Sequence, residues 1–134
     1  MYYDVVILGL SRASAKPKTQ LLENTEGNLN PNLLKGNLDL ILLAIIEPAA
    51  IYGSEITREA SERSQGYFDF KEGTLYPALH RLEKAGFIRG AFQYLPRGGS
   101  PVKFYELTQS GKKELHDQRQ AQQAFGQAMS RLLS

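Results

Sequence analysis

The feature that most constrains the fold is a short amphipathic helix predicted for residues 71–82. At 100° per residue, the apolar side chains of Leu75, Ala78, Leu79 and Leu82 fall on one face, which must be buried. The opposite face is polar and becomes cationic toward its end, and a glycine and a β-like pattern follow directly. This order of parts predicts a winged helix-turn-helix, which presents such a helix to the DNA major groove. An ordinary surface helix is the alternative.

Charge is distributed unevenly along the chain. The net charge is only +2, so bulk charge does not indicate a polyanionic partner. Between residues 71 and 113, however, cations outnumber acidic residues by eight to three, whereas acidic residues gather at Glu55, Glu59 and Glu62. This asymmetry favours a basic face for a polyanion, with a solvated charged surface as the alternative.

Composition also excludes or disfavours several kinds of site. The chain has no cysteine, so disulfides, thiolate catalysis and thiolate metal sites are excluded. His80 and His116 lie on helix faces predicted to be exposed, and no cluster of His, Asp and Glu has metal-ligand spacing. No apolar run approaches the ~20 residues of a membrane span. We therefore expect a cytoplasmic protein that does not enter the membrane, is not an enzyme, and uses no metal or cofactor.

Three regions follow from the patterning of the chain. Residues 1–31 are expected to form an N-terminal extension and linker, because a short apolar run is followed by a polar stretch with Pro17 and Gly27 as breakers. Residues 32–108 are expected to form the winged helix-turn-helix domain, and residues 109–134 one long helix. The predicted fold class is therefore mainly α with a small β-hairpin.

The helices of the domain are predicted from their caps and breakers. The first is expected to have Asn37 as its N-cap and to end before Pro48. Because this helix is apolar nearly all round, part of it is expected to meet a second subunit. A second helix is predicted from residue 54 to 63, and Gly86 is expected to cap the helix of residues 71–82 in a left-handed conformation.

The hairpin and the last helix complete the pattern. A change to a period of two predicts a strand that starts at Ile88, a loop over residues 96–101 and a strand over residues 102–107. Thr108 is expected to cap a helix of ~25 residues, ~37 Å long, which would not be stable alone with an apolar stripe in water. The predicted use of this helix is dimerisation, and a helix folded back on its own domain is the alternative. Its stripe has heptad-like spacing and consists of Leu115, Gln118, Gln122, Phe125, Met129 and Leu132.

With these parts in place, the chain resembles the PadR family of bacterial transcription regulators. The resemblance rests on five segments between about residues 34 and 115: residues 34–39, 52–56, 73–79, 81–86 and 104–111. The Gly-Thr-Leu-Tyr-Pro-Ala-Leu string is the most specific of them, and the single tail helix is similar to the small subgroup of the family. Two departures are Ser54, where the family usually has an aromatic, and Val102-Lys103, where it usually has a basic pair.

The resemblance implies a homodimer that binds a pseudo-palindromic operator in double-stranded DNA and represses transcription. It also implies a small aromatic effector, because related short members hold flat apolar compounds between subunits. Phe125 and Met129, with Ile41 or Ile45, are predicted to line such a cavity, and plain dimer core is the alternative. The residues expected at the dimer interface are Ile41, Ile45, Leu115, Gln122, Phe125, Met129 and Leu132.

The DNA contacts are assigned from the position of each side chain in the predicted module. Base-edge and groove contacts are assigned to Thr74, Tyr76, Pro77, His80 and Arg81. Phosphate contacts are assigned to Lys35, Lys71, Lys84 and Lys103, and a minor-groove contact to Arg97. The alternative role of Arg81 is to bind a phosphate. The alternative for Tyr76 is a structural role, in which it packs beside the hairpin. For the whole module, the alternative function is docking of a protein partner in place of DNA.

Overall fold

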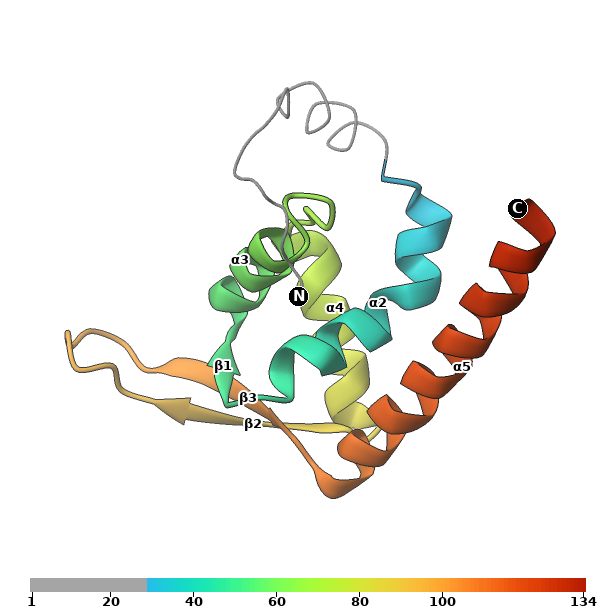
Figure 1. Ribbon diagram of the computed structural model, residues 1–134. Helices are drawn as coiled ribbons and strands as arrows, with labels where there is room; N and C mark the ends of the chain where they lie inside the picture. The colour runs from blue at the N-terminus through green and yellow to red at the C-terminus, as the bar shows by residue number, and fades with distance from the viewer. Residues whose placement is uncertain (1–28) are drawn as a thin grey trace.

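The computed structural model describes residues 29–134, which form four helices and a three-stranded antiparallel sheet (Figure 1). Most of the predicted N-terminal extension lies outside the described residues. In chain order the elements are α2 (Pro31–Ile46), β1 (Ile51–Tyr52), α3 (Gly53–Arg63), α4 (Glu72–Lys84), β2 (Ile88–Gln93), β3 (Val102–Leu107) and α5 (Gln109–Leu133). The predicted fold class is confirmed by this architecture.

Helix α2 begins earlier than its apolar run indicates. The side chain of Asn30 accepts a hydrogen bond from the backbone N–H of Asn32 at 2.8 Å, and Pro31 fits the first helical position because its missing N–H would have no partner there. The prediction of Asn37 as the N-cap is therefore wrong. Asn37 lies inside the helix, where its side-chain amide donates to the carbonyl of Leu33 at 2.8 Å.

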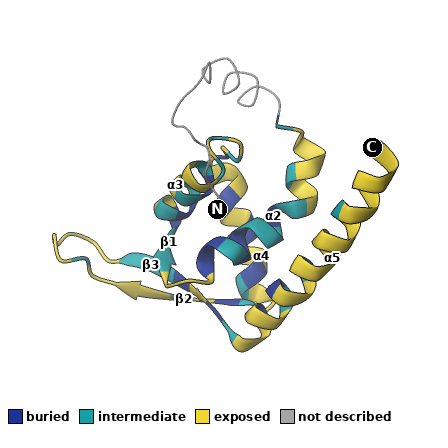
Figure 2. Cartoon of the chain, in the orientation of Figure 1, coloured by how far each residue is buried: buried dark blue, intermediate teal, exposed yellow. Residues whose placement is uncertain are grey.

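The core lies between α2, α3, α4 and the sheet (Figure 2). The four apolar residues predicted to be buried on α4 are confirmed, since each is at most 2% exposed. They pack with residues from the other elements, among them Leu42, Leu43, Ile56, Ile88 and Leu115. One face of α4 is thus fixed in the domain, and its opposite face stays exposed.

The sheet has the strand order β1-β3-β2. Strands β2 and β3 form the predicted hairpin, in register from Ile88 opposite Leu107 to Gln93 opposite Val102. This hairpin, residues 88–107, extends beyond the helices in Figure 1 and is called the wing from here on. Strand β1 has only two residues, too few to show an alternating pattern, so the sequence did not reveal it.

The start of α5 is fastened to the end of α4. The Thr108 hydroxyl accepts from the N–H of Gly111 at 3.0 Å, as predicted for an N-cap, and donates to the carbonyl of Gly86 at 2.6 Å. Gly86 has a φ of 85°, which confirms the predicted left-handed cap. The backbone N–H of Thr108 also donates to the carbonyl of Phe87 at 3.0 Å. These contacts join the base of α5 to the residues that follow the end of α4.

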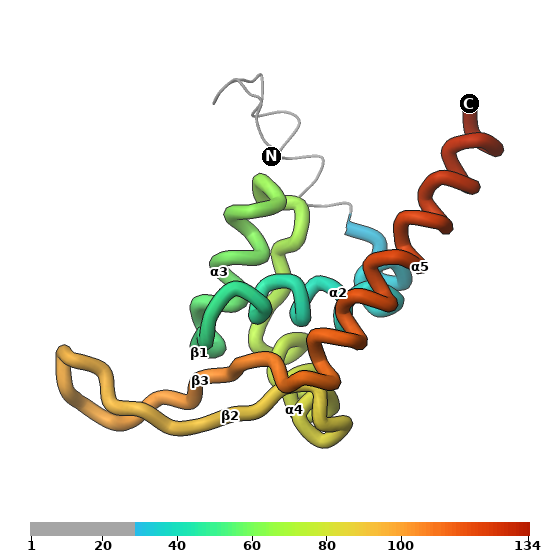
Figure 3. The backbone as a smooth tube through the Cα atoms, turned by 60° about the horizontal axis from the view of Figure 1, so that its bottom comes forward, coloured from blue at the N-terminus to red at the C-terminus, as the bar shows by residue number. Residues whose placement is uncertain are grey.

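The C-terminal half of α5 runs away from the rest of the domain, as the ribbon of Figure 1 and the backbone tube of Figure 3 both show. Leu115, near its start, is fully buried in the core of its own domain, and an ion pair between Arg119 and Glu47 at 3.3 Å ties the helix to the end of α2. Beyond that point Phe125 and Leu132 are 68% and 80% exposed. No helix among residues 29–134 has the length and apolar character needed to cross a membrane.

Candidate nucleic-acid interface

The exposed side of α4 carries a stripe of residues opposite its buried face. Gly73, Pro77, His80 and Lys84 follow each other at intervals of four, three and four residues, which places them on one side of a helix. All four are exposed, as are Thr74 and Lys71. We call Gly73, Pro77, His80 and Lys84 the outer stripe. Near the start of α4 the stripe has no bulky side chain, because Gly73 has open space around it. In the last turn of α4 the stripe is cationic, because it ends in Lys84.

One flank of the outer stripe faces α2. Arg81 forms an ion pair with Asp39 of α2 at 2.5 Å, and the two side chains are 57% and 37% exposed. An exposed pair of this kind contributes little to stability, so the guanidinium can leave Asp39 for a stronger acceptor. The geometry does not distinguish a guanine from a phosphate as that acceptor, and both assignments of Arg81 stay predictions.

The other flank faces the wing. Lys103 of β3 donates to the carboxylate of Glu83 on α4 at 3.1 Å, and this hydrogen bond raises the pKa of Lys103 above its usual value. Gly90 makes room for this contact, because an added Cβ there would overlap the side chain of Lys103. Both partners are only about one-third exposed, at 34% and 33%. The predicted phosphate contact of Lys103 therefore requires this ion pair to break, and in the described structure Lys103 holds the wing against α4.

Tyr76 is shared between the exposed surface and the packing of the domain. Its side chain is 42% exposed, and its hydroxyl end lies over Gly53 so closely that a Cβ at Gly53 would overlap it. The alternative proposed from the sequence is packing beside the hairpin. The close contact of this side chain is instead with Gly53, at the start of α3, so half of the residue is used for packing within the domain. The other half is available at the edge of the outer stripe.

The remaining predicted cations have no ionic partner among the described residues. Lys71 lies at the N-cap position of α4, Lys84 in its last turn, and Arg97 in the tight loop at the tip of the wing. None of them has a carboxylate within 4.0 Å in residues 29–134. Lys35 is likewise exposed and unpaired there, but it lies on the N-terminal half of α2, away from the wing (Figure 1).

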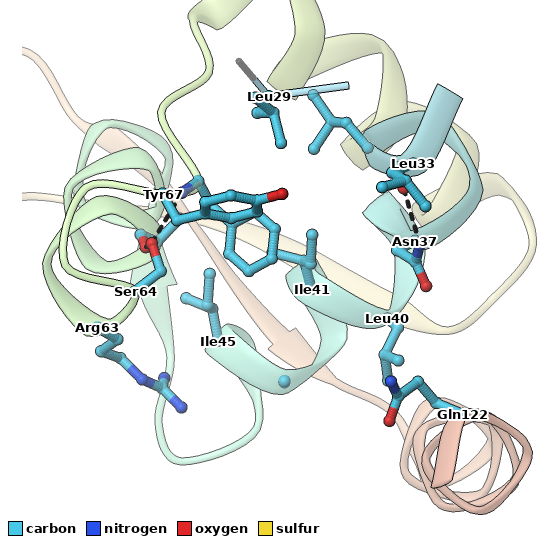
Figure 4. Close-up of a pocket in the computed structure, with 14 residues that line it drawn as sticks. Leu29, Leu33, Asn37, Leu40, Ile41, Ile45, Arg63, Ser64, Tyr67 and Gln122 are labelled. Atoms are coloured by element: carbon cyan, nitrogen blue, oxygen red, sulfur yellow. Dashed lines mark hydrogen bonds between the residues drawn. The ribbon is translucent and has the colours of Figure 1, made fainter. Parts of the chain in front are cut away.

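A second feature is an apolar groove of about 590 Å³ between α2, the end of α3 and α5 (Figure 4). Ile41 and Ile45, which the sequence assigned to an interfacial cavity, line it, and so does Gln122 of α5. Phe125 and Met129 are not among its lining residues in the single chain. The rest of the lining is mainly apolar and includes Leu29, Leu33, Leu40, Tyr67 and Phe68.

The aromatic wall of the groove was not recognised as part of a site from the sequence. Tyr67 and Phe68 lie in the connection between α3 and α4, where no periodicity indicates which way a side chain points. Their rings stand edge to face with centroids 5.2 Å apart, and Figure 4 shows Tyr67 over Ile41. Within residues 29–134, no group of three or more His, Cys, Asp or Glu side chains is placed to hold a metal ion.

Comparison with known proteins gives concordant matches. The model of the transcriptional regulator PadR-like family matches residues 42–117. The structure of a PadR-like transcriptional regulator from Bacillus cereus is similar with a TM-score of 0.69 and 28% identity, over 77% of this chain and 97% of that one. An uncharacterized protein of Lysinibacillus sphaericus is 37% identical over 86 residues, which are 64% of this chain and 78% of that protein.

PadR of Bacillus subtilis, named as a negative transcriptional regulator, is a third relative. It is 33% identical over 81 residues, which are 60% of this chain and 43% of PadR. The crystal structure of Bacillus subtilis PadR in complex with operator DNA matches with a TM-score of 0.55 and 31% identity, over 60% of this chain and 44% of that one. The chain thus spans less than half the length of this regulator.

Proposed function

Since this chain belongs to the PadR-like family of transcriptional regulators, we propose that it binds operator DNA as a homodimer and represses transcription. The observation that carries the proposal is the exposed outer stripe of α4, with Lys71 at the start of the helix and Arg97 at the tip of the wing, neither of which has an ionic partner among residues 29–134. A convex, partly cationic helix surface of this kind fits the major groove, and an exposed lysine such as Lys71 at its start fits a phosphate. A bacterial protein that binds operator DNA acts in the cytoplasm, and we propose this location for the chain.

The exposed face of α4 itself does not favour the alternative of a protein-docking module. A docking face of that kind would carry an apolar patch at its centre. The outer stripe instead combines a glycine, a proline, a histidine and a lysine. One of its flanks carries the exposed Arg81, and the carboxylate of Glu83 on the other flank is balanced by Lys103. Chemistry of this kind complements a polyanion better than it complements an apolar protein surface.

The proposed homodimer is supported by the exposed seam of α5. Phe125, Met129 and Leu132 are 68%, 36% and 80% exposed and share one side of the helix. An isolated helix with such a stripe gains stability when a second copy covers it. A twofold axis between two α5 helices would present two copies of α4 to successive major grooves, ~34 Å apart.

An effector site is proposed at the groove along α2. Its volume of about 590 Å³ is in the range of small-molecule pockets, and its walls are mainly apolar, with Ile41, Ile45 and Tyr67 among the residues that line it. In a dimer, Phe125 and Met129 of the second copy could close its open side. A flat aromatic compound held there would bear on α2 and α5, and the contacts of Thr108 would carry a displacement of α5 to α4.

The test of the proposal is selection of bound sequences from random duplex DNA. We expect enrichment of a pseudo-palindrome whose half-sites are about 10 base pairs apart. If the dimer neutralises ~6–10 phosphates, the logarithm of the binding constant should fall against log salt with a slope of roughly −5 to −9. A slope near zero on the selected duplex, or no enrichment at all, would contradict DNA binding.

Replacing Gly73 by alanine is expected to separate DNA binding from stability. Gly73 has open space on the α4 surface, so the new methyl group should leave the unfolding free energy unchanged or raise it by up to ~1 kcal/mol. If the start of α4 approaches the DNA closely, the same methyl group should weaken binding to the selected duplex about 10-fold. The measurements are the melting temperature and a DNA titration, and unchanged affinity would argue against this position of α4.

A further inference from the structure

The wing carries two aromatic side chains that the domain leaves in solvent. Phe92 of β2 is 68% exposed, and Tyr94, just after the strand, is 76% exposed. Along a strand, alternate residues point to the same face, so Phe92 lies on the face of Ile88, which enters the core. The same alternation places Gln93 on the opposite face, and, if it continues one residue beyond β2, Tyr94 on the face of Phe92. Single exposed aromatics are common, but two on one face of a narrow hairpin form a surface.

This face of the wing is continuous with the surface of α4. Phe92 lies opposite Lys103 in the register of β2 and β3, and the Lys103 ammonium is 6.0 Å from the centre of the Phe92 ring. The same ammonium is bonded to Glu83 of α4. Phe92 therefore lies next to the flank of the outer stripe that faces the wing. A duplex held against α4 would extend over the Phe92 ring.

The wing also has few charges left for DNA. Lys103 is engaged by Glu83, and Arg89 is paired with Glu106 at 3.0 Å on the other face of the hairpin. Arg97 at the tip is the cation of the wing without an ionic partner among the described residues. A wing of this composition cannot hold a duplex mainly by ion pairs, so its apolar side chains have to contribute.

We propose that Phe92 and Tyr94 are further DNA-contacting residues of this chain, and that their rings pack against the sugar walls of the minor groove beside the major groove entered by α4. Apolar side chains are known to contact DNA from the minor groove, where they can wedge between base steps and bend the duplex. Arg97, which the sequence assigns to the minor groove, then lies at the same groove. This inference rests on the proposed function and adds to it a contact that is not ionic.

The chain offers a clean reporter for this contact. It contains no tryptophan, so Tyr94→Trp places a single tryptophan on the wing, whose emission can be excited apart from that of the tyrosines. Titration with the duplex selected in the experiment above should quench or shift its emission at the same concentrations at which DNA binds. Emission that responds to protein concentration but not to the duplex would show that the face meets another copy of the chain, and would overturn the proposal.

Affinity measurements complete the test. The double variant Phe92→Ala/Tyr94→Ala should bind the selected duplex roughly 10- to 100-fold more weakly, with an unchanged salt slope because no cation is lost. Gln93→Ala, on the opposite face of the same strand, is the matched control and should bind like the wild type. The melting temperature of each variant checks the fold, and Tyr94→Ala alone keeps the test readable if the double variant is unstable.

The outcomes separate the two proposals. If the wild-type protein binds no duplex, the proposed function fails and this inference fails with it. If the wild type binds and the double variant binds equally well, only the role of the aromatic face is wrong. A weaker double variant whose salt slope has fallen by about 1 would also overturn the inference, because that change indicates a lost phosphate contact.

Discussion

Replacing Gly111 by alanine is expected to destabilise the domain by about 3 kcal/mol or more, and to lower the melting temperature by roughly 10 °C or more. Gly111 is buried in the first turn of α5, against the backbone of Phe87. A Cβ at this position would overlap the Phe87 carbonyl oxygen, which is already fixed by its hydrogen bond from Thr108. Backbone cannot rotate aside as a side chain can, so α5 must move away from α4.

Gly73→Ala is the matched control for this prediction. Both glycines lie in the first turn of a helix, but Gly73 has no atom near its added Cβ, so this variant should be as stable as the wild type or more stable. Thermal unfolding of both variants at one protein concentration makes the comparison. Equal melting temperatures would mean that the base of α5 yields easily, and that the link between α5 and α4 is loose.

The same link explains the Thr-Gln-Ser-Gly segment that the sequence singled out. Thr108 and Ser110 both donate to the carbonyl of Gly86, at 2.6 and 2.9 Å, and Gly111 allows the close approach. The end of α4 and the start of α5 are thus one rigid corner. The segment therefore has a structural role: it fixes the position of the start of α5 relative to the outer stripe of α4.

The periodic parts of the fold could be predicted from the sequence because burial decides them. Apolar spacing and local capping each act within a few residues of the chain. They predict the buried face of α4, the hairpin of β2 and β3, and the N-cap of α5 at Thr108. The start of α2 was misplaced because its first two turns carry few apolar residues, whereas Asn30 and Pro31 fix the helix start locally. A cap is decided by one side chain, and Asn37 and Asn30 look alike without the structure.

The candidate site was predictable in its location and less so in its contacts. The exposure of His80 and Lys84 follows from the helical pattern, but the partners of Arg81 and Lys103 are 42 and 20 residues away in sequence. No local pattern signals that Asp39 or Glu83 meets them, since such pairs depend on how helices and sheet pack. That Lys103 holds the wing against α4 could be recognised only from the structure, which places its ammonium 3.1 Å from the Glu83 carboxylate.

Placing a charge in the α5 seam is expected to have the largest effect on DNA binding. Phe125→Glu should give a folded monomer, because Phe125 is 68% exposed and makes no part of the core of its own domain. A buried, unpaired carboxylate would oppose association of two α5 helices. Without the second subunit each half-site is bound separately, so affinity for the selected duplex should fall by about 100- to 10,000-fold. Sedimentation equilibrium and a DNA titration measure the two effects.

Gln127→Glu is the matched control, because it adds the same charge to the same helix about 200° away from Phe125. It should leave the dimer intact and the affinity close to that of the wild type. A loss of affinity in both variants, with the dimer intact, would mean that negative charge on α5 repels the DNA and that the seam plays no part in assembly. A Phe125→Glu protein that is still dimeric would show that the copies meet elsewhere. The groove along α2 would then lack the second wall that an effector pocket between subunits requires.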